Sequence, residues 1–95
     1  MTSLEERIWK VERNANADEK LLIATRTARA RLNEEEFEVV EQVGDSIKDM
    51  TAQQELTSVL EVLDASFGDI PRLILERYAR LVEEEYALLL RGEDV

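Results

Sequence analysis

The stretch Phe67-Gly68-Asp69-Ile70-Pro71 separates two predicted helices in the C-terminal part of the chain. Glycine suits the left-handed end of a helix, aspartate suits a cap, and proline is tolerated in a first helical turn. The stretch therefore predicts a sharp corner, followed by a helix from about Ile70 to Arg91. The apolar residues of this last helix cover more than the single stripe that a surface helix needs. We expect it to lie at the centre of the fold or in an oligomer interface.

Three further helix starts precede this corner, at Ser3, Asn33 and Thr51. Ser3 and Thr51 are each followed three residues later by glutamate or glutamine, which is the capping-box pattern. Asn33 precedes three glutamates, whose charges suit the positive end of a helix. Apolar residues recur at helical spacing after each start. The positions expected to point inward are Phe37, Val40, Val43 and Ile47 after the second start, and Leu56, Val59, Leu60 and Leu63 after the third.

The segment from Asn14 to Asp18 weakens the first helix, because Asn and Asp side chains compete for backbone hydrogen bonds. We expect one long helix with a soft spot there, or a break with Asn16 as the new cap. Glycine and proline are too scarce, at three and one, for the turns of a sheet. The chain is long enough for one hydrophobic core and too short for two. The sequence thus predicts one all-α domain over residues 1–95, a small antiparallel four-helix bundle.

The composition excludes most catalytic chemistry. Cysteine and histidine are absent, which excludes thiol nucleophiles, Ser-His triads, zinc sites and disulfides. We expect no enzyme activity, no cofactor and no metal site. No apolar run approaches the ~18 residues that span a bilayer, and the first residues lack a signal-peptide pattern. We therefore expect a cytoplasmic protein without membrane contact.

The net charge of -10 lies almost wholly in the middle of the chain. Residues 1–32 carry seven basic and five acidic side chains, residues 33–70 carry one and eleven, and residues 71–95 carry four and six. An acidic surface repels phosphate backbones, so we expect a basic protein partner rather than direct nucleic-acid binding. Imitation of nucleic acid, as by small acidic phage inhibitors of nucleic-acid-binding proteins, is an alternative function.

Two acidic clusters, separated by 22 intervening residues, suggest a second alternative. They are Glu34, Glu35 and Glu38, then Glu61 and Asp64. The pattern resembles the paired acidic motifs of the all-α nucleoside triphosphate pyrophosphohydrolases, the MazG-like family, and the resemblance implies a Mg²⁺ site between two helices. In this chain the first cluster stands at a helix start and the second leads directly into the corner. We therefore expect these acids to face solvent and not to form a metal site.

The expected function is protein binding without catalysis, as a regulatory, adaptor or accessory subunit. The apolar stripe of the last helix spans about 140° at 100° per residue, wider than the ~100° that one neighbouring layer requires. A symmetric homodimer would cover the excess, and three neighbouring helices around the last one are the competing explanation. The residues expected to contact a partner are Glu34, Glu35, Glu38, Glu41, Asp45, Leu75, Val82, Tyr86 and Leu89.

Overall fold

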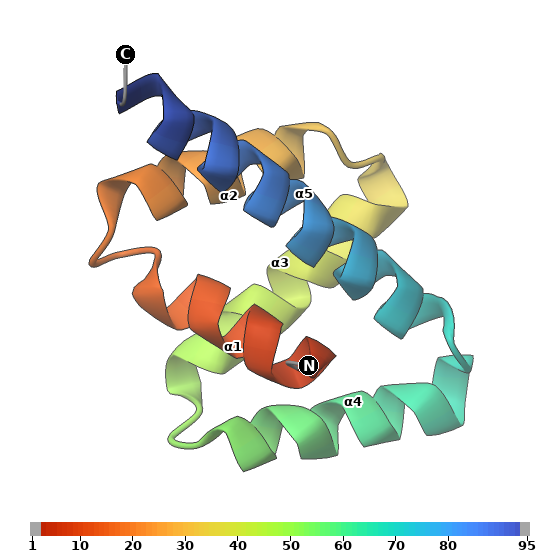
Figure 1. The fold of residues 1–95 in the computed structure, drawn as a ribbon. Helices are drawn as coiled ribbons and strands as arrows, with labels where there is room; N and C mark the ends of the chain where they lie inside the picture. The colour runs from red at the N-terminus through yellow and green to blue at the C-terminus, as the bar shows by residue number, and fades with distance from the viewer. Residues whose placement is uncertain (1–2, 94–95) are drawn as a thin grey trace.

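Five α-helices and no strand make up residues 3–93, the part of the chain that this computed structural model describes (Figure 1). The all-α prediction is confirmed. Five helices are found in place of the predicted four, because the first helix breaks between Asn14 and Glu19, which is the alternative to one long helix that the sequence left open. Within the described residues, no helix has the length and apolar character needed to cross a membrane. The helices are α1 (Leu4–Asn14), α2 (Glu19–Ala30), α3 (Glu34–Asp49), α4 (Gln53–Phe67) and α5 (Ile70–Glu93).

Asp18 starts α2 and fixes the turn from α1. Its Oδ1 accepts hydrogen bonds from the backbone N–H groups of Lys20 at 3.0 Å and Leu21 at 3.2 Å. These are two of the N–H groups that a helix start leaves without an intrahelical partner. Asp18 Oδ2 accepts a third bond, from the hydroxyl of Tyr86 in α5 at 2.7 Å. The prediction of Asn16 as the cap is therefore wrong, since a residue far along the chain helps to hold Asp18 at this position.

The other helix starts follow local rules with one exception. Ser3 and Asn33 cap α1 and α3 as predicted, and Asn33 does so in a reciprocal capping box. The capping box predicted at Thr51 is wrong, because the N-cap of α4 is Ala52 and makes no side-chain cap bond. Thr51 bonds to Glu55 instead, through its hydroxyl at 2.6 Å and its N–H at 3.2 Å.

Helix α5 is the centre of the fold and packs against each of the other four helices (Figure 1). Helix α1 runs in the same general direction as α5, since Glu5 pairs with Arg72 early in α5 while Val11 lies near Val82 later in it. The arrangement is therefore not antiparallel throughout. The core combines side chains of all five helices, and its largest fully buried members are Tyr78, Ile8, Ile47, Leu56, Leu60, Leu75, Val40 and Val82.

A buried polar cluster joins four helices within this core. Glu12 of α1 accepts hydrogen bonds from Arg29 of α2 and from the hydroxyl of Tyr78 of α5, each at 2.8 Å. Arg29 also pairs with Glu41 of α3 at 3.0 Å. Burial and the neighbouring Glu12 carboxylate raise the pKa of Tyr78, so its hydroxyl stays a proton donor. A Cβ atom at Gly44 would lie 3.0 Å from Arg29 Nη2, so the glycine leaves room for the cluster.

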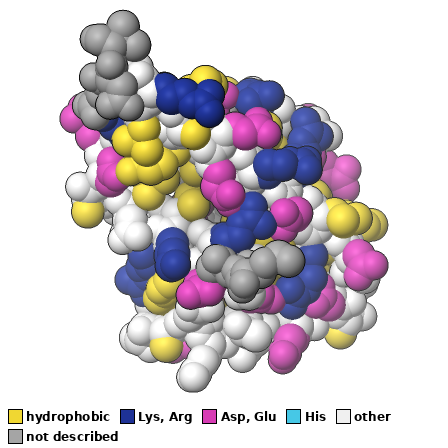
Figure 2. Space-filling view, viewed as in Figure 1, with side chains coloured by type: hydrophobic (Ala, Val, Ile, Leu, Met, Phe, Trp, Pro, Cys, Tyr) yellow, Lys and Arg dark blue, Asp and Glu magenta, His cyan; other side chains and the backbone are white. Residues whose placement is uncertain are grey.

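Charged side chains alternate over the face that α1 and α5 form together (Figure 2). Arg7 of α1 donates hydrogen bonds to Glu76 at 2.9 Å and to Glu83 at 2.7 Å. Arg72 of α5 donates to Asp64 of α4 at 2.6 Å. Such partly exposed pairs contribute about 1 kcal/mol or less each.

The corner between α4 and α5 depends on Gly68. Its φ of 68° and ψ of -140° lie in a region that is nearly restricted to glycine. Its N–H donates to the carbonyl of Asp64 at 2.9 Å, which closes the end of α4. The turn predicted from the sequence is therefore confirmed at this residue.

Substitution Gly68→Ala is expected to lower the free energy of unfolding by about 1 to 3 kcal/mol, the usual cost of a strained backbone. No heavy atom lies within 4 Å of the added Cβ, so the cost would come from the backbone conformation alone. Chemical denaturation would measure it. Gly92→Ala is the matched control, because that glycine lies within α5 with equally open space and no positive φ. Equal denaturation midpoints for the two variants would contradict the assignment.

Candidate functional site

A groove with a volume of about 490 Å³ lies between α3, α4 and the start of α5. Its two long walls are α3 and α4, which both belong to the acidic residues 33–70. The first turns of α5, after the Gly68 corner, close one end of the groove. Its polar lining comes almost wholly from α3, as Glu35, Glu38, Gln42 and Ser46. Its apolar lining is Val39 and Val43 of α3, Val59, Leu63 and Phe67 of α4, and Ile70, Pro71 and Ile74 at the corner and in α5.

The polar residues form one stripe along α3, because spacings of three and four residues place side chains on the same helix face. Ser46 donates its hydroxyl to the carbonyl of Gln42 at 2.8 Å and so is satisfied within its own helix. Glu35 and Glu38 are exposed, and neither forms an ion pair with a side chain of residues 3–93. No Lys or Arg lines the groove. Its α3 edge therefore carries two uncompensated negative charges.

The apolar wall of α4 is only half-covered. Leu56 and Leu60 are buried as predicted, whereas Val59 and Leu63 are half-buried and line the groove. Phe67, at the end of the same stripe, is 62% exposed. The reason is that α3 and α4 pack mainly against α1 and α5 and contact each other little. Phe37, which was also predicted to point inward, is 42% exposed, so that prediction is wrong.

The acids predicted to contact a partner have different surroundings. Glu35 and Glu38 line the groove, and Glu34 is exposed beside them in the first turn of α3. Glu41 and Asp45 form ion pairs with basic side chains of the same chain, at 3.0 Å and 3.5 Å. The structure thus brings together only part of the predicted acidic surface.

The apolar residues predicted to contact a partner lie mostly inside the fold. Leu75 and Val82 are only 1% and 0% exposed, because four helices pack against α5 and cover this part of its apolar stripe, whereas Leu73 and Leu88 of the same helix stay exposed. A partner cannot reach these two side chains on the folded chain, which corrects their assignment to a surface. Tyr86 and Leu89 are half-buried and pack against the core.

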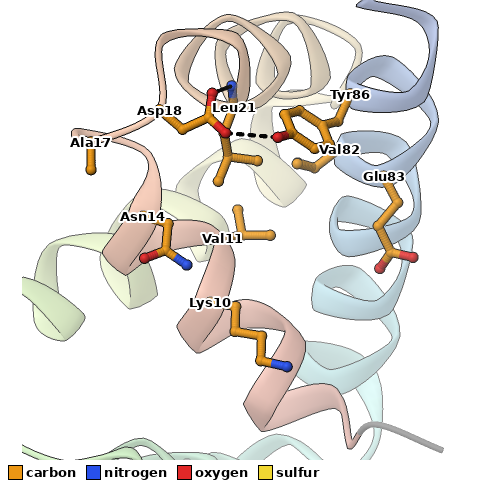
Figure 3. A pocket seen from close by; sticks show the side chains of 9 residues that line it. All are labelled: Lys10, Val11, Asn14, Ala17, Asp18, Leu21, Val82, Glu83 and Tyr86. Carbon is orange, nitrogen blue, oxygen red and sulfur yellow. Dashed lines mark hydrogen bonds between the residues drawn. The ribbon is translucent and has the colours of Figure 1, made fainter. Parts of the chain in front are cut away.

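A second hollow, with a volume of about 460 Å³, lies between α1, α2 and α5 (Figure 3). Asp18 and Tyr86 lie together at one end of it, joined by their hydrogen bond. This bond lowers the pKa of Asp18 and raises that of Tyr86. Glu83, at its edge, is paired with Arg7. These polar groups already serve the packing of the helices, so the α3–α4–α5 groove is the stronger candidate site. The apolar lining of the second hollow is Val11, Ala17, Leu21 and Val82.

The two acidic clusters that resemble the pyrophosphohydrolase motifs are not assembled into a metal centre. Asp64 is engaged by Arg72. Glu61 is exposed on α4 and does not line the groove that Glu35 and Glu38 border. Across residues 3–93, no group of three or more acidic side chains is placed so that it could hold a metal ion. The geometry therefore offers no support for the Mg²⁺ site that the resemblance implies.

Comparison with models of protein families, with curated proteins and with solved structures finds no match to this chain. The α3–α4–α5 groove is accordingly identified by its geometry and charge alone.

Proposed function

We propose that this protein is an interaction module without catalytic activity, and that it binds a partner protein in the α3–α4–α5 groove. The observation that carries the proposal is the group of apolar side chains left open at the groove and beside it. Val62, Phe67 and Ile70 are 66%, 62% and 58% exposed. Val62 borders a shallow hollow on α4 that shares Val59 and Leu63 with the groove. Contiguous exposed apolar surface is typical of protein-binding sites.

Covering these side chains would supply much of the binding free energy. Full burial of a side chain such as Phe or Ile is worth about 1.5 to 3 kcal/mol. A partner that covers several of them and the half-buried groove walls would gain enough to offset part of the entropy lost on association. The unpaired Glu35 and Glu38 would add specificity and a faster encounter with a basic partner.

The acidic segment supports nucleic-acid imitation less well. A mimic needs carboxylates that stay free to meet the basic residues of its target. Glu36, Glu41 and Asp64 instead pair with arginines of the same chain, Glu36 with Arg77 at 3.0 Å. The groove therefore favours binding of an apolar segment over imitation of a phosphate backbone.

A photoreactive phenylalanine analogue at position 67 is expected to cross-link a specific partner in extracts of cells that make the protein. The same analogue at Phe37 is the matched control, because Phe37 is an exposed phenylalanine of α3 outside the groove. The adduct should be absent at position 37 and reduced when Leu63→Asp is added to the position-67 variant. Mass spectrometry would identify the adduct, and an adduct of two copies would reveal the predicted homodimer. Equal labelling from both positions, or from Phe37 alone, would contradict the proposed site.

A further inference from the structure

We infer that the occupant of the α3–α4–α5 groove is a short amphipathic helix of another protein, with Lys or Arg on the flank that lies beside α3. This inference rests on the proposed function and specifies its ligand. It follows from the lining of the groove, from its length and from its charge.

The lining requires a partner that satisfies its own backbone. The groove is walled by side chains of three helices, and residues 3–93 contain no strand edge to which an extended peptide could add. Backbone N–H and C=O groups that enter an apolar groove without partners are costly. A helix pairs these groups internally, and helix-in-groove binding uses apolar anchors at positions i, i+3, i+4 and i+7. A helical ligand therefore fits this lining better than an extended one.

The length of the groove sets the length of the ligand. The polar stripe that borders it runs from Glu35 to Ser46 on α3. At about 1.5 Å per residue the eleven steps between them span roughly 16 Å, or three helical turns. A ligand helix of about 11 or 12 residues would cover this distance. Isolated helices of that length are marginal in water, so the segment is expected to complete its folding on binding.

The negative charge of the groove favours basic residues on the side of the ligand helix that lies next to α3. Glu35 and Glu38 edge it on α3, no basic side chain lines it, and its two long walls belong to a segment with eleven acidic and one basic residue. A cationic flank would pair with these carboxylates. A second copy of the chain fits less well, because its net charge of -10 would repel the same edge.

Synthetic peptides test the inference on the full-length, ¹⁵N-labelled protein. The first is a 12-residue peptide of leucine, alanine and lysine with helical amphipathic spacing. The second has the same composition in scrambled order, and the third replaces lysine by glutamate. We expect the first peptide alone to bind, with its chemical-shift changes concentrated at Val39, Val59, Leu63 and Ile74. Binding of the scrambled peptide with equal affinity, or shift changes centred on the Asp18–Tyr86 hollow, would overturn the inference.

Two double variants distinguish the effect of the groove carboxylates on peptide affinity from the effect of the overall net charge. The double variant Glu35→Gln, Glu38→Gln is expected to bind the lysine-containing peptide about fivefold less tightly, which is the effect expected from the loss of two exposed ion pairs. Glu19→Gln with Glu61→Gln removes the same charge from exposed acids outside the groove and should change binding less. Equal weakening by both pairs would mean that the peptide only follows the overall charge, and would overturn the inference. If no peptide binds while Phe67 still cross-links a partner, the proposed function stands and the helical ligand is wrong.

Discussion

Substitution Glu12→Ala is expected to lower the free energy of unfolding by about 3 to 5 kcal/mol. This is the usual cost of removing one partner of a buried ion pair and leaving the other charge buried. The Glu12 side chain is only 9% exposed and accepts hydrogen bonds from Arg29 and Tyr78. Without it, the Arg29 guanidinium keeps only Glu41, and the buried Tyr78 hydroxyl has no acceptor. Chemical denaturation followed by circular dichroism would measure the loss.

Glu41→Ala is the matched control, because Glu41 pairs with the same arginine but its side chain is 35% exposed. Water can replace this partner, so the expected cost is about 1 kcal/mol or less. Glu12→Gln should fall between the two alanine variants, since it keeps a neutral acceptor in place. If Glu12→Ala and Glu41→Ala cost the same, the cluster is more hydrated than its burial indicates.

Substitution Val82→Glu is expected to prevent stable folding. Val82 is 0% exposed in the core around α5 and belongs to the apolar lining of the second hollow, so glutamate there would place a carboxylate against apolar side chains. An unpaired buried charge costs several kcal/mol, which is a large share of the roughly 5 to 15 kcal/mol that stabilises a small domain.

Leu89→Glu is the companion variant, because Leu89 lies on the same helix but is only half-buried. We expect it to fold with a much smaller loss of stability. Thermal unfolding and sedimentation of both variants distinguish a core position from an interface position. A folded, monomeric Val82→Glu variant of a dimeric wild type would instead place Val82 in a homodimer interface and contradict the packing described here.

The helix ends show how much of the fold local sequence determines. Ser3, Asn33 and Gly68 could be assigned in advance, because each acts through backbone groups within four residues of itself. Asp18 also caps its helix through backbone N–H groups two and three residues away, but the sequence placed two candidate caps, Asn16 and Asp18, side by side, and the bond from Tyr86, 68 residues away, adds to the hold on Asp18. The sequence offered the break between α1 and α2 as an alternative and placed its cap two residues too early.

The candidate site was only partly visible in the sequence. The excess of acid in residues 33–70 can be counted directly, and Glu35 and Glu38 belong to it. Which acids stay unpaired depends on where the arginines of α2 and α5 lie, and these reach Glu41, Glu36 and Asp64 from another helix in each case.

By itself, the sequence determined the helical class, most helix ends and the acidity of the middle segment, because these depend on composition and on hydrogen bonds between near neighbours. The tertiary structure decided which apolar faces are covered. Val59 and Leu63 have the same helical spacing as buried core residues, yet they line a groove, whereas Val82 is buried although its wide stripe suggested an interface. The helical spacing of apolar residues shows that a helix has an apolar face, but it does not show whether another helix packs on that face. That depends on how the helices pack around α5 and on the separation of α3 from α4.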